Sequence, residues 1–318
     1  KISERLDPSR PTNILAPPLQ PSQIYMPLRG GGTREDYEVY AESCFSHEKR
    51  ALLVARDVTS KYTRRNRGEY EKIADYIYRT VAARPGNYMV FCPSYTYMQE
   101  IFHVYEELFG GNEGISCILQ SEHMTEEERS GFLDRFRSIG EIRNSVETQG
   151  KAPCQTGENG LEQASLKMRI EAPCQSVGNN ETQNLTRTRK ALLAFCVLGG
   201  IFSEGIDLAG ESLIGAVIIG TGLPQIGQEK ELLRRYFDQK GENGFDYAYR
   251  YPGMNKVMQA AGRVIRTKED VGVVVLLDER FLQGQYRGIF PREWDNYQAV
   301  SLNTVQKKLK EFWDGNNT

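Results

Sequence analysis

Six short stretches of the chain are apolar at almost every position, and longer amphipathic stretches separate them. The apolar stretches are 51–55, 87–93, 115–120, 191–198, 214–220 and 272–278. Uninterrupted apolar runs of this length are typical of strands covered on both faces, as in a parallel sheet between layers of helices. The pattern therefore predicts a doubly wound α/β domain, with a mostly parallel sheet of about six strands flanked by helices.

A helical spacing of apolar residues recurs between these strands. Helices are expected over 68–83, 94–109, 125–137, 227–239, 253–267 and 299–313. Ser94 stands where its hydroxyl can accept a hydrogen bond from an amide in the first turn of the second helix. Thr125, followed three residues later by Glu128, is the sequence of a capping box and marks the start of the third.

Two parts of the chain lie outside this alternation. Residues 1–45 contain Pro-Pro and Gly-Gly-Gly runs and are expected to form an irregular lead-in or interdomain connector. Residues 46–318 form the predicted domain, interrupted at about 140–189 by a polar insert in which A-P-C-Q-T recurs as A-P-C-Q-S. Two copies are too few for a solenoid, so we expect a flexible surface loop. A partner-binding or redox-sensing role through Cys154 and Cys174 is the alternative.

Composition and charge make several classes of protein improbable, among them membrane proteins and proteins with a zinc or iron–sulfur site. The formal net charge is −2, so any contact with nucleic acid depends on local basic groups. No apolar run reaches the roughly 18 residues of a membrane span, and the first residues lack the apolar core of a signal peptide, so we expect a cytoplasmic protein with no membrane partner. The six cysteines include no C-x-x-C pair, so neither a zinc nor an iron–sulfur site is expected. The chain begins with Lys1, without Met, which suggests an excised fragment.

The strongest chemical signal is Q-A-A-G-R-V-I-R-T at 259–267, directly before the last apolar strand. Spacings of four and three residues place Gln259, Arg263 and Arg266 on one face of the expected helix. Guanidinium groups are permanently charged bidentate donors, which suits the phosphoryl oxygens of a triphosphate. Gly262 is unfavourable inside a helix and is explained if a ligand approaches the backbone there. A solvated basic face is the alternative interpretation.

A second segment, G-G-I-F-S-E-G-I-D-L-A-G, follows the strand over 191–198. Loops at the carboxyl ends of parallel strands are where α/β sheets bind ligands. Its glycines permit tight turns, and Glu204 and Asp207 add carboxylates beside Gly205. Taken alone, the segment is equally well explained as a plain turn.

A third segment, M-V-F-C-P-S-Y-T-Y-M at 89–98, runs from a strand into a helix N-terminus. Ser94 and the first helical amides could bind a phosphate of the DNA backbone. Tyr95 and Tyr97 could stack on bases, although helix capping and core packing explain the same residues.

The stretch 53–65 adds a group of basic residues close to the end of the first strand. These are Arg56, Lys61, Arg64 and Arg65. They form either a phosphate-contacting patch or a solvated loop.

Together these segments, over about 49–138 and 190–283, resemble motifs VI, V and IV of superfamily 2 helicases, specifically the second motor domain of the XPD/DinG family. The resemblance implies a RecA-like (P-loop NTPase-like) fold that closes on a first motor domain around ATP and Mg²⁺. In that family one motif VI arginine acts as an arginine finger, and the motif V acids organise the nucleotide cleft. The implied residues are Gln259, Arg263 and Arg266 for catalysis; Glu204, Gly205, Asp207 and Gly262 for the nucleotide; and Ser94, Tyr95, Arg56 and Arg64 for single-stranded DNA.

Two departures from the family pattern bear on activity. The sequence contains no G-x-x-x-x-G-K followed by Ser or Thr, and no D-E-A-H-type segment. We therefore expect a helicase acting in DNA repair or replication whose first motor domain lies outside this chain, and no ATP hydrolysis by the chain alone. The alternatives are a non-enzymatic module that binds single-stranded nucleic acid or protein, and a nucleotide-binding transferase of another α/β class.

Overall fold

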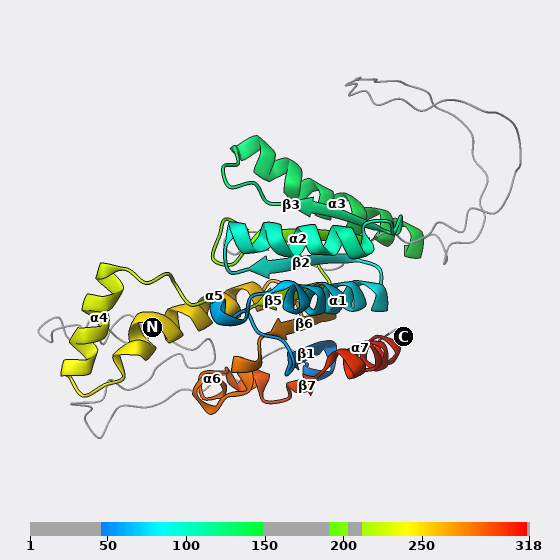
Figure 1. Cartoon of the computed structure of the whole chain (residues 1–318). Coiled ribbons are helices and arrows are strands. Elements are labelled where there is room, and N and C mark those ends of the chain that lie inside the picture. Colours follow the sequence, from blue (N-terminus) through cyan, green and yellow to red (C-terminus); the bar gives the residue numbers. More distant parts are fainter. Residues whose placement is uncertain (1–45, 149–190, 203–211, 317–318) are drawn as a thin grey trace, which may run out of the picture.

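The computed structural model describes residues 46–148, 191–202 and 212–316, the side chains of 138–148 excepted. Its centre is a seven-stranded sheet in the order β3-β4-β2-β5-β6-β1-β7, in which every neighbouring pair is parallel (Figure 1). The strands are β1 Arg50–Ala55, β2 Asn87–Cys92, β3 Ile115–Leu119, β4 Ala191–Val197, β5 Gly215–Ile219, β6 Gly272–Leu277 and β7 Gln298–Val300. The six predicted strands and the parallel α/β architecture are confirmed.

The seventh strand was not predicted. Residues 299–313 were expected to be helical, but Gln298–Val300 pairs with β1 and the helix begins at Leu302. Ser301 sets this boundary, because its side chain forms a capping box with Thr304. A strand of three residues is too short to show a periodic pattern, so only its partner reveals it.

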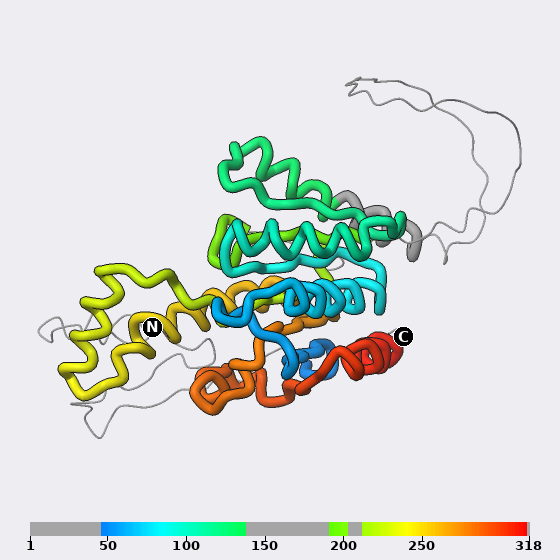
Figure 2. The backbone as a smooth tube through the Cα atoms, viewed as in Figure 1, coloured from blue at the N-terminus to red at the C-terminus, as the bar shows by residue number. Residues whose placement is uncertain are grey.

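Two layers of helices cover the sheet (Figures 1 and 2). The helices are α1 Arg67–Ala83, α2 Tyr95–Phe109, α3 Glu126–Thr148, α4 Gln228–Gln239, α5 Tyr251–Ala261, α6 Gly284–Arg287 and α7 Leu302–Gly315. One core cluster joins α1, α2 and α7 to one sheet face, and a second joins α3, α5 and the segment around α6 to the other. A π-helix over Asp246–Arg250 leads into α5, and with α4 it projects away from the sheet (Figure 1).

Two helix boundaries differ from expectation. The third helix extends to Thr148, nine residues into the expected insert at 140–189; no proline interrupts it. The rest of that insert, with its repeat, lies outside the described residues, as does the lead-in over 1–45.

The helix expected over 253–267 ends earlier, at Ala261. The next amides, of Arg263 and Val264, donate to carbonyls three residues back, which is turn geometry. Val264 and Ile265 then enter the second core, 2% and 7% exposed. The expected single helical face for Gln259, Arg263 and Arg266 is therefore wrong, because the helix ends before Arg263 and the chain turns to bring Val264 and Ile265 into the second core.

Because all the strands are parallel, they begin along one side of the sheet and end along the opposite side. The side formed by the first residues of the strands is here called the amino edge, and the side formed by their last residues is called the carboxyl edge; neither term refers to the outermost strands β3 and β7. α5 runs from the carboxyl edge to the amino edge. At its start, a Cβ atom on Gly253 would lie 2.6 Å from the carbonyl oxygen of Thr221, just after β5. Past its end, Val264 packs against Gly272, the first residue of β6. With about 3.3 Å per strand residue, the two edges are roughly 20 Å apart.

Candidate functional site

The three residues expected to face a triphosphate gather at the amino edge. Gln259 is exposed in the last turn of α5, and Arg263 and Arg266 are half-buried just beyond it. The carbonyl oxygen of Lys268, two residues after Arg266, accepts a hydrogen bond at 2.8 Å from Nζ of Lys49, the residue directly before β1. This contact places the loop after α5 at the amino edge. The three polar side chains thus come from a helix end and the following loop, not from one helical face.

Asp270 gives this loop its shape. Its carboxylate is buried and accepts hydrogen bonds from the backbone amides of Arg266, at 2.7 Å, and Thr267, at 2.8 Å. The Thr267 hydroxyl donates a third, at 2.9 Å. A buried carboxylate with several donors fixes the backbone that carries Arg266. Sequence inspection did not single out Asp270, since one acid in a polar stretch is an ordinary surface feature.

Gly262 follows α5 with φ −67° and ψ −3°, a conformation open to any residue. The nearest atoms to a Cβ at this position would be carbonyl oxygens of its own preceding turn, at 3.3 Å or more. Gly262 itself is exposed. Ligand approach to its backbone therefore remains a prediction.

At the carboxyl edge, the segment after β2 has the predicted cap. Ser94 Oγ accepts a hydrogen bond from the amide of Tyr97 at 3.3 Å. Tyr97 is 2% exposed and meets Tyr70 edge-on, with ring centroids 5.5 Å apart. Base stacking by Tyr97 is therefore excluded, because no base can reach a ring inside the core.

Tyr95 is half-buried at the same edge, and Gln120 fixes it. Gln120 follows β3; its side-chain amide donates to the Tyr95 hydroxyl at 2.7 Å and its oxygen accepts from the amide of Val197, at the end of β4, at 2.9 Å. Burial and the charge of Glu122 raise the pKa of Tyr95, outweighing the contact with Gln120. Tyr95 is thus a neutral, positioned ring beside the ends of three strands.

The glycine-rich segment after β4 is described only at its two flanks. Gly199, with φ +75°, lies against the side chain of Lys256, so Lys256 reaches the carboxyl edge. Phe202 stacks on Phe132 at 4.2 Å. Glu204, Gly205 and Asp207 lie outside the described residues.

The second flank lies at the opposite edge of the sheet. The carbonyl oxygen of Ser212 accepts a hydrogen bond from the side chain of Asn87, the first residue of β2, at 3.0 Å. Gly199 and Gly200, before the segment 203–211, therefore lie at the carboxyl edge beside Gln120, and Ser212, after it, lies at the edge where Arg263 lies.

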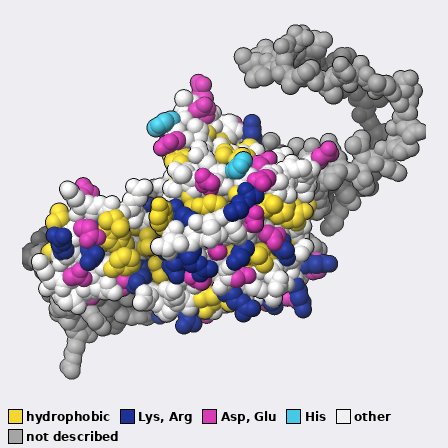
Figure 3. All heavy atoms as spheres, in the orientation of Figure 1, with side chains coloured by type: hydrophobic (Ala, Val, Ile, Leu, Met, Phe, Trp, Pro, Cys, Tyr) yellow, Lys and Arg dark blue, Asp and Glu magenta, His cyan; other side chains and the backbone are white. Residues whose placement is uncertain are grey.

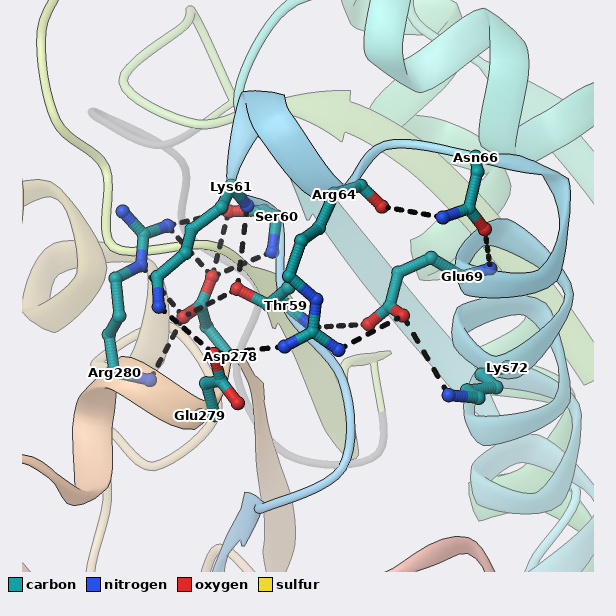
Figure 4. A network of polar contacts seen from close by, with 10 residues as sticks. All are labelled: Thr59, Ser60, Lys61, Arg64, Asn66, Glu69, Lys72, Asp278, Glu279 and Arg280. Carbon is teal, nitrogen blue, oxygen red and sulfur yellow. Dashed lines mark hydrogen bonds and ion pairs between the residues drawn. The ribbon is translucent and has the colours of Figure 1, made fainter.

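A network of polar contacts organises the loop between β1 and α1 (Figure 4). Asp278, directly after β6, is fully buried and accepts hydrogen bonds from the Ser60 amide and hydroxyl, both at 2.8 Å, and from Arg280 Nε at 2.8 Å. Glu69, also buried, accepts from the amide of Thr59 at 2.6 Å. Two buried carboxylates thus anchor Thr59 and Ser60.

Charge compensation lets Asp278 remain ionised. Burial alone would raise the pKa of this carboxyl, but the hydrogen bonds and charge of Arg280 outweigh burial, so its pKa is lowered. Burial would likewise lower the pKa of Arg280, and Asp278 raises it. Asp278 was not predicted as a structural centre, although its position just after an apolar strand was a usable signal.

The basic residues of this loop differ in their surroundings. Arg56 is exposed, and its backbone amide donates to Val300 in β7 at 3.0 Å. Arg64 and Lys61 both contact Glu279 Oε1, at 3.3 and 3.0 Å. In Figure 3, Lys and Arg side chains alternate with Asp and Glu over the face shown, without a field of one sign. Contact with phosphate at Arg64 therefore has to compete with Glu279.

Comparison with known proteins identifies the family. The model of the helicase C-terminal domain matches residues 77–297. The chain belongs to the helicase C-terminal domain family. Within it, this chain is a second motor domain of the XPD/DinG-like group of superfamily 2.

Individual relatives agree with this placement. The ATP-dependent DNA helicase chl-1 of Caenorhabditis elegans is 30% identical over 136 residues, which cover 41% of this chain and 16% of that protein. The ATP-dependent DNA helicase DinG of Photobacterium profundum is 38% identical over 89 residues, which cover 27% of this chain and 13% of that protein. A solved XPD helicase structure shares the fold, with a TM-score of 0.51 and 19% identity over 79% of this chain and 35% of that one. The chain spans less than a third of the length of the curated relatives it matches.

Proposed function

We propose that this helicase C-terminal domain is the ATP-sensing and DNA-gripping half of an ATP-dependent DNA helicase that moves along single-stranded DNA and unwinds duplexes. The observation that carries the proposal is the separation of two polar groups at opposite edges of one sheet. The amino edge has Gln259, Arg263 and Arg266, and the carboxyl edge has Ser94 and Tyr95.

The amino-edge group suits a triphosphate held by another domain. Arg263 and Arg266 carry permanent charge and forked donors on a partly exposed surface, which matches phosphoryl oxygens. One guanidinium placed against the γ-phosphate would stabilise the charge that develops during hydrolysis. The side chain of Gln259 would lie beside the same phosphate. The exposed backbone at Gly262 would let the nucleotide approach closely. Mg²⁺ accompanies ATP and neutralises phosphate charge; we assign its ligands to the first motor domain.

The carboxyl-edge group suits a single strand of DNA. The Ser94 turn supplies a helix N-terminus toward a phosphate, and Tyr95 supplies a fixed ring. Arg56 and Arg64 would add phosphate contacts at the end of β1.

Coupling between the two groups would use elements that connect both edges. α5 is one, since its first turn packs at the carboxyl edge and its last turn carries Gln259. The segment with Glu204, Gly205 and Asp207 is the second, because Gly199, before it, lies at the carboxyl edge and Ser212, after it, lies at the amino edge. Closing and reopening of the cleft between the motor domains would then step the protein along the strand. Roles in DNA repair or replication and a cytoplasmic location are proposed on the family resemblance.

The test is ATP hydrolysis with and without the first motor domain. The chain alone should show no turnover, with or without single-stranded DNA. A longer protein that includes the first motor domain should show DNA-stimulated turnover. Arg263→Ala in that protein should lower turnover by roughly 10³- to 10⁵-fold, with little change in melting temperature.

Arg137→Ala, an exposed arginine on α3, is the matched control and should keep full turnover. Wild-type turnover in Arg263→Ala would remove the catalytic assignment. DNA-stimulated hydrolysis by the chain alone would contradict the need for a first motor domain. If the longer protein bound single-stranded DNA but did not hydrolyse ATP, the chain would instead be a binding module.

A further inference from the structure

One aromatic side chain at the carboxyl edge is unusually exposed. Tyr62 lies in a single 3-10 turn, Tyr62–Arg64, between β1 and α1, and is 83% exposed. Most of the other large aromatic residues described in this domain are buried in the two core clusters or half-buried against them. Because an aromatic ring in water forgoes the stabilisation of burial, a ring held out in this way suggests a ligand surface.

The backbone beneath Tyr62 is anchored. Thr59 and Ser60 are 0% and 5% exposed and are bound to Glu69 and Asp278 by the contacts shown in Figure 4. The Glu279 amide also donates to Val58 at 2.8 Å. Tyr62 therefore projects from a fixed base, which limits the conformational entropy lost on binding a partner.

A guanidinium group lies against the ring of Tyr62. The Arg65 guanidinium lies 5.4 Å from the Tyr62 ring centroid and 4.6 Å from that of Tyr97. Its Nε donates to the carbonyl oxygen of Ser60 at 3.3 Å. Lys61 directly precedes Tyr62 in the sequence and Arg64 follows two residues later; both contact Glu279 Oε1, at 3.0 and 3.3 Å (Figure 4). An aromatic ring among cations is the combination that binds a nucleic-acid base together with its phosphate.

This loop adjoins the proposed DNA residues. A Cβ atom on Gly220, after β5, would meet Ser60 Oγ and lie 3.3 Å from Pro93, the residue before Ser94. Arg65 also connects the two segments, because its guanidinium group lies over the ring of Tyr97 in the first turn of α2. The Tyr62 turn and the Ser94 turn are thus neighbours on one edge of the sheet.

We propose that Tyr62 is a base-stacking platform for single-stranded DNA, with Arg65 behind the ring. The inference rests on the proposed function, because it extends the DNA surface at the carboxyl edge. It assigns to Tyr62 the stacking contact that the sequence suggested for Tyr97. A base has a π-face whatever its identity, so the contact is tolerant of sequence.

The test compares two strands that differ only in their bases. Binding of fluorescent oligothymidylate and of an abasic strand of equal length is measured by anisotropy for the full chain and its variants. Tyr62→Ala should weaken binding to oligothymidylate by roughly 5- to 150-fold, since stacking contributes about 1–3 kcal/mol per base. Binding to the abasic strand should change little, and Tyr62→Phe should restore oligothymidylate binding.

Tyr236→Ala is the control, because Tyr236 on α4 is 39% exposed and also has a cation near its ring, Lys240 at 4.5 Å. It should bind both strands as the wild type does. Unchanged oligothymidylate binding by Tyr62→Ala, or an equal loss with Tyr236→Ala or on the abasic strand, would overturn the inference alone. A wild-type chain that binds neither strand would contradict the DNA surface as a whole, and Tyr62 with it.

Discussion

The carboxylate of Asp278 accepts two hydrogen bonds from Ser60, one from its amide and one from its hydroxyl, both at 2.8 Å, across 218 residues of sequence. The two residues meet because β1 and β6 are parallel neighbours whose carboxyl ends coincide. This contact joins the end of β6 to the loop that presents Lys61, Tyr62 and Arg64.

Loss of the Asp278 charge should destabilise the domain. Asp278→Asn should lower the free energy of unfolding by about 3 kcal/mol, because it leaves the largely buried Arg280, whose side chain is 15% exposed, without its ion-pair partner. Urea unfolding followed by circular dichroism measures the change. Asp134→Asn, an exposed residue paired with Arg137 on α3, should shift it by no more than about 0.5 kcal/mol. Equal effects of the two substitutions would contradict the buried ion pair.

The same carboxyl predicts an acid dependence of stability. Its pKa is below the ordinary value of 3.8 in the folded protein, so the folded state favours the ionised form. This contribution is fully present above the unfolded pKa and is lost as the pH falls through the folded pKa. Below about pH 4 the difference in stability between wild type and Asp278→Asn should therefore shrink. A difference that stays constant into acid would contradict the ionised state of Asp278.

Substituting two glycines that both have a positive φ distinguishes the cost of the left-handed backbone from the cost of a steric clash. Gly222 has φ +67°, and a Cβ there would lie 2.5 Å from the carbonyl oxygen of Gly253; Gly241 has φ +79° and nothing within 4 Å. Gly241→Ala should cost only the left-handed conformation, about 1–2 kcal/mol. Gly222→Ala should cost about 1–3 kcal/mol more, because it pushes α5 away from β5. Equal urea midpoints for the two variants would show that α5 is not packed closely there.

Asp270 should affect ATP hydrolysis through Arg266, as a positioning residue. In a protein that includes the first motor domain, Asp270→Ala removes the acceptor for the amides of Arg266 and Thr267, so kcat should fall by up to roughly 100-fold. Affinity for single-stranded DNA should be unchanged, since the DNA residues lie at the other edge. Glu269→Ala, exposed and adjacent, should keep wild-type kcat. A fall in DNA affinity that matched the fall in kcat would indicate general loss of structure instead.

The amino-acid sequence by itself determined the architecture of this helicase domain. Burial on both faces leaves a direct mark on a strand, so six apolar runs located six strands. Local capping by Ser94 and by Thr125 with Glu128 was also readable, because each acts within three residues of its partner. The family resemblance followed from the combination of short motifs.

Only the tertiary structure decided which residues lie at the two edges and which enter the core. Tyr95 and Tyr97 stand two residues apart in the same turn, yet Tyr97 is buried and Tyr95 is half-buried. α5 ends at Ala261 because Val264 and Ile265 are drawn into a core made by distant strands. The contact of Asp278 with Ser60 depends on strand order. Packing and strand order are properties of the whole chain, and no local pattern encodes them.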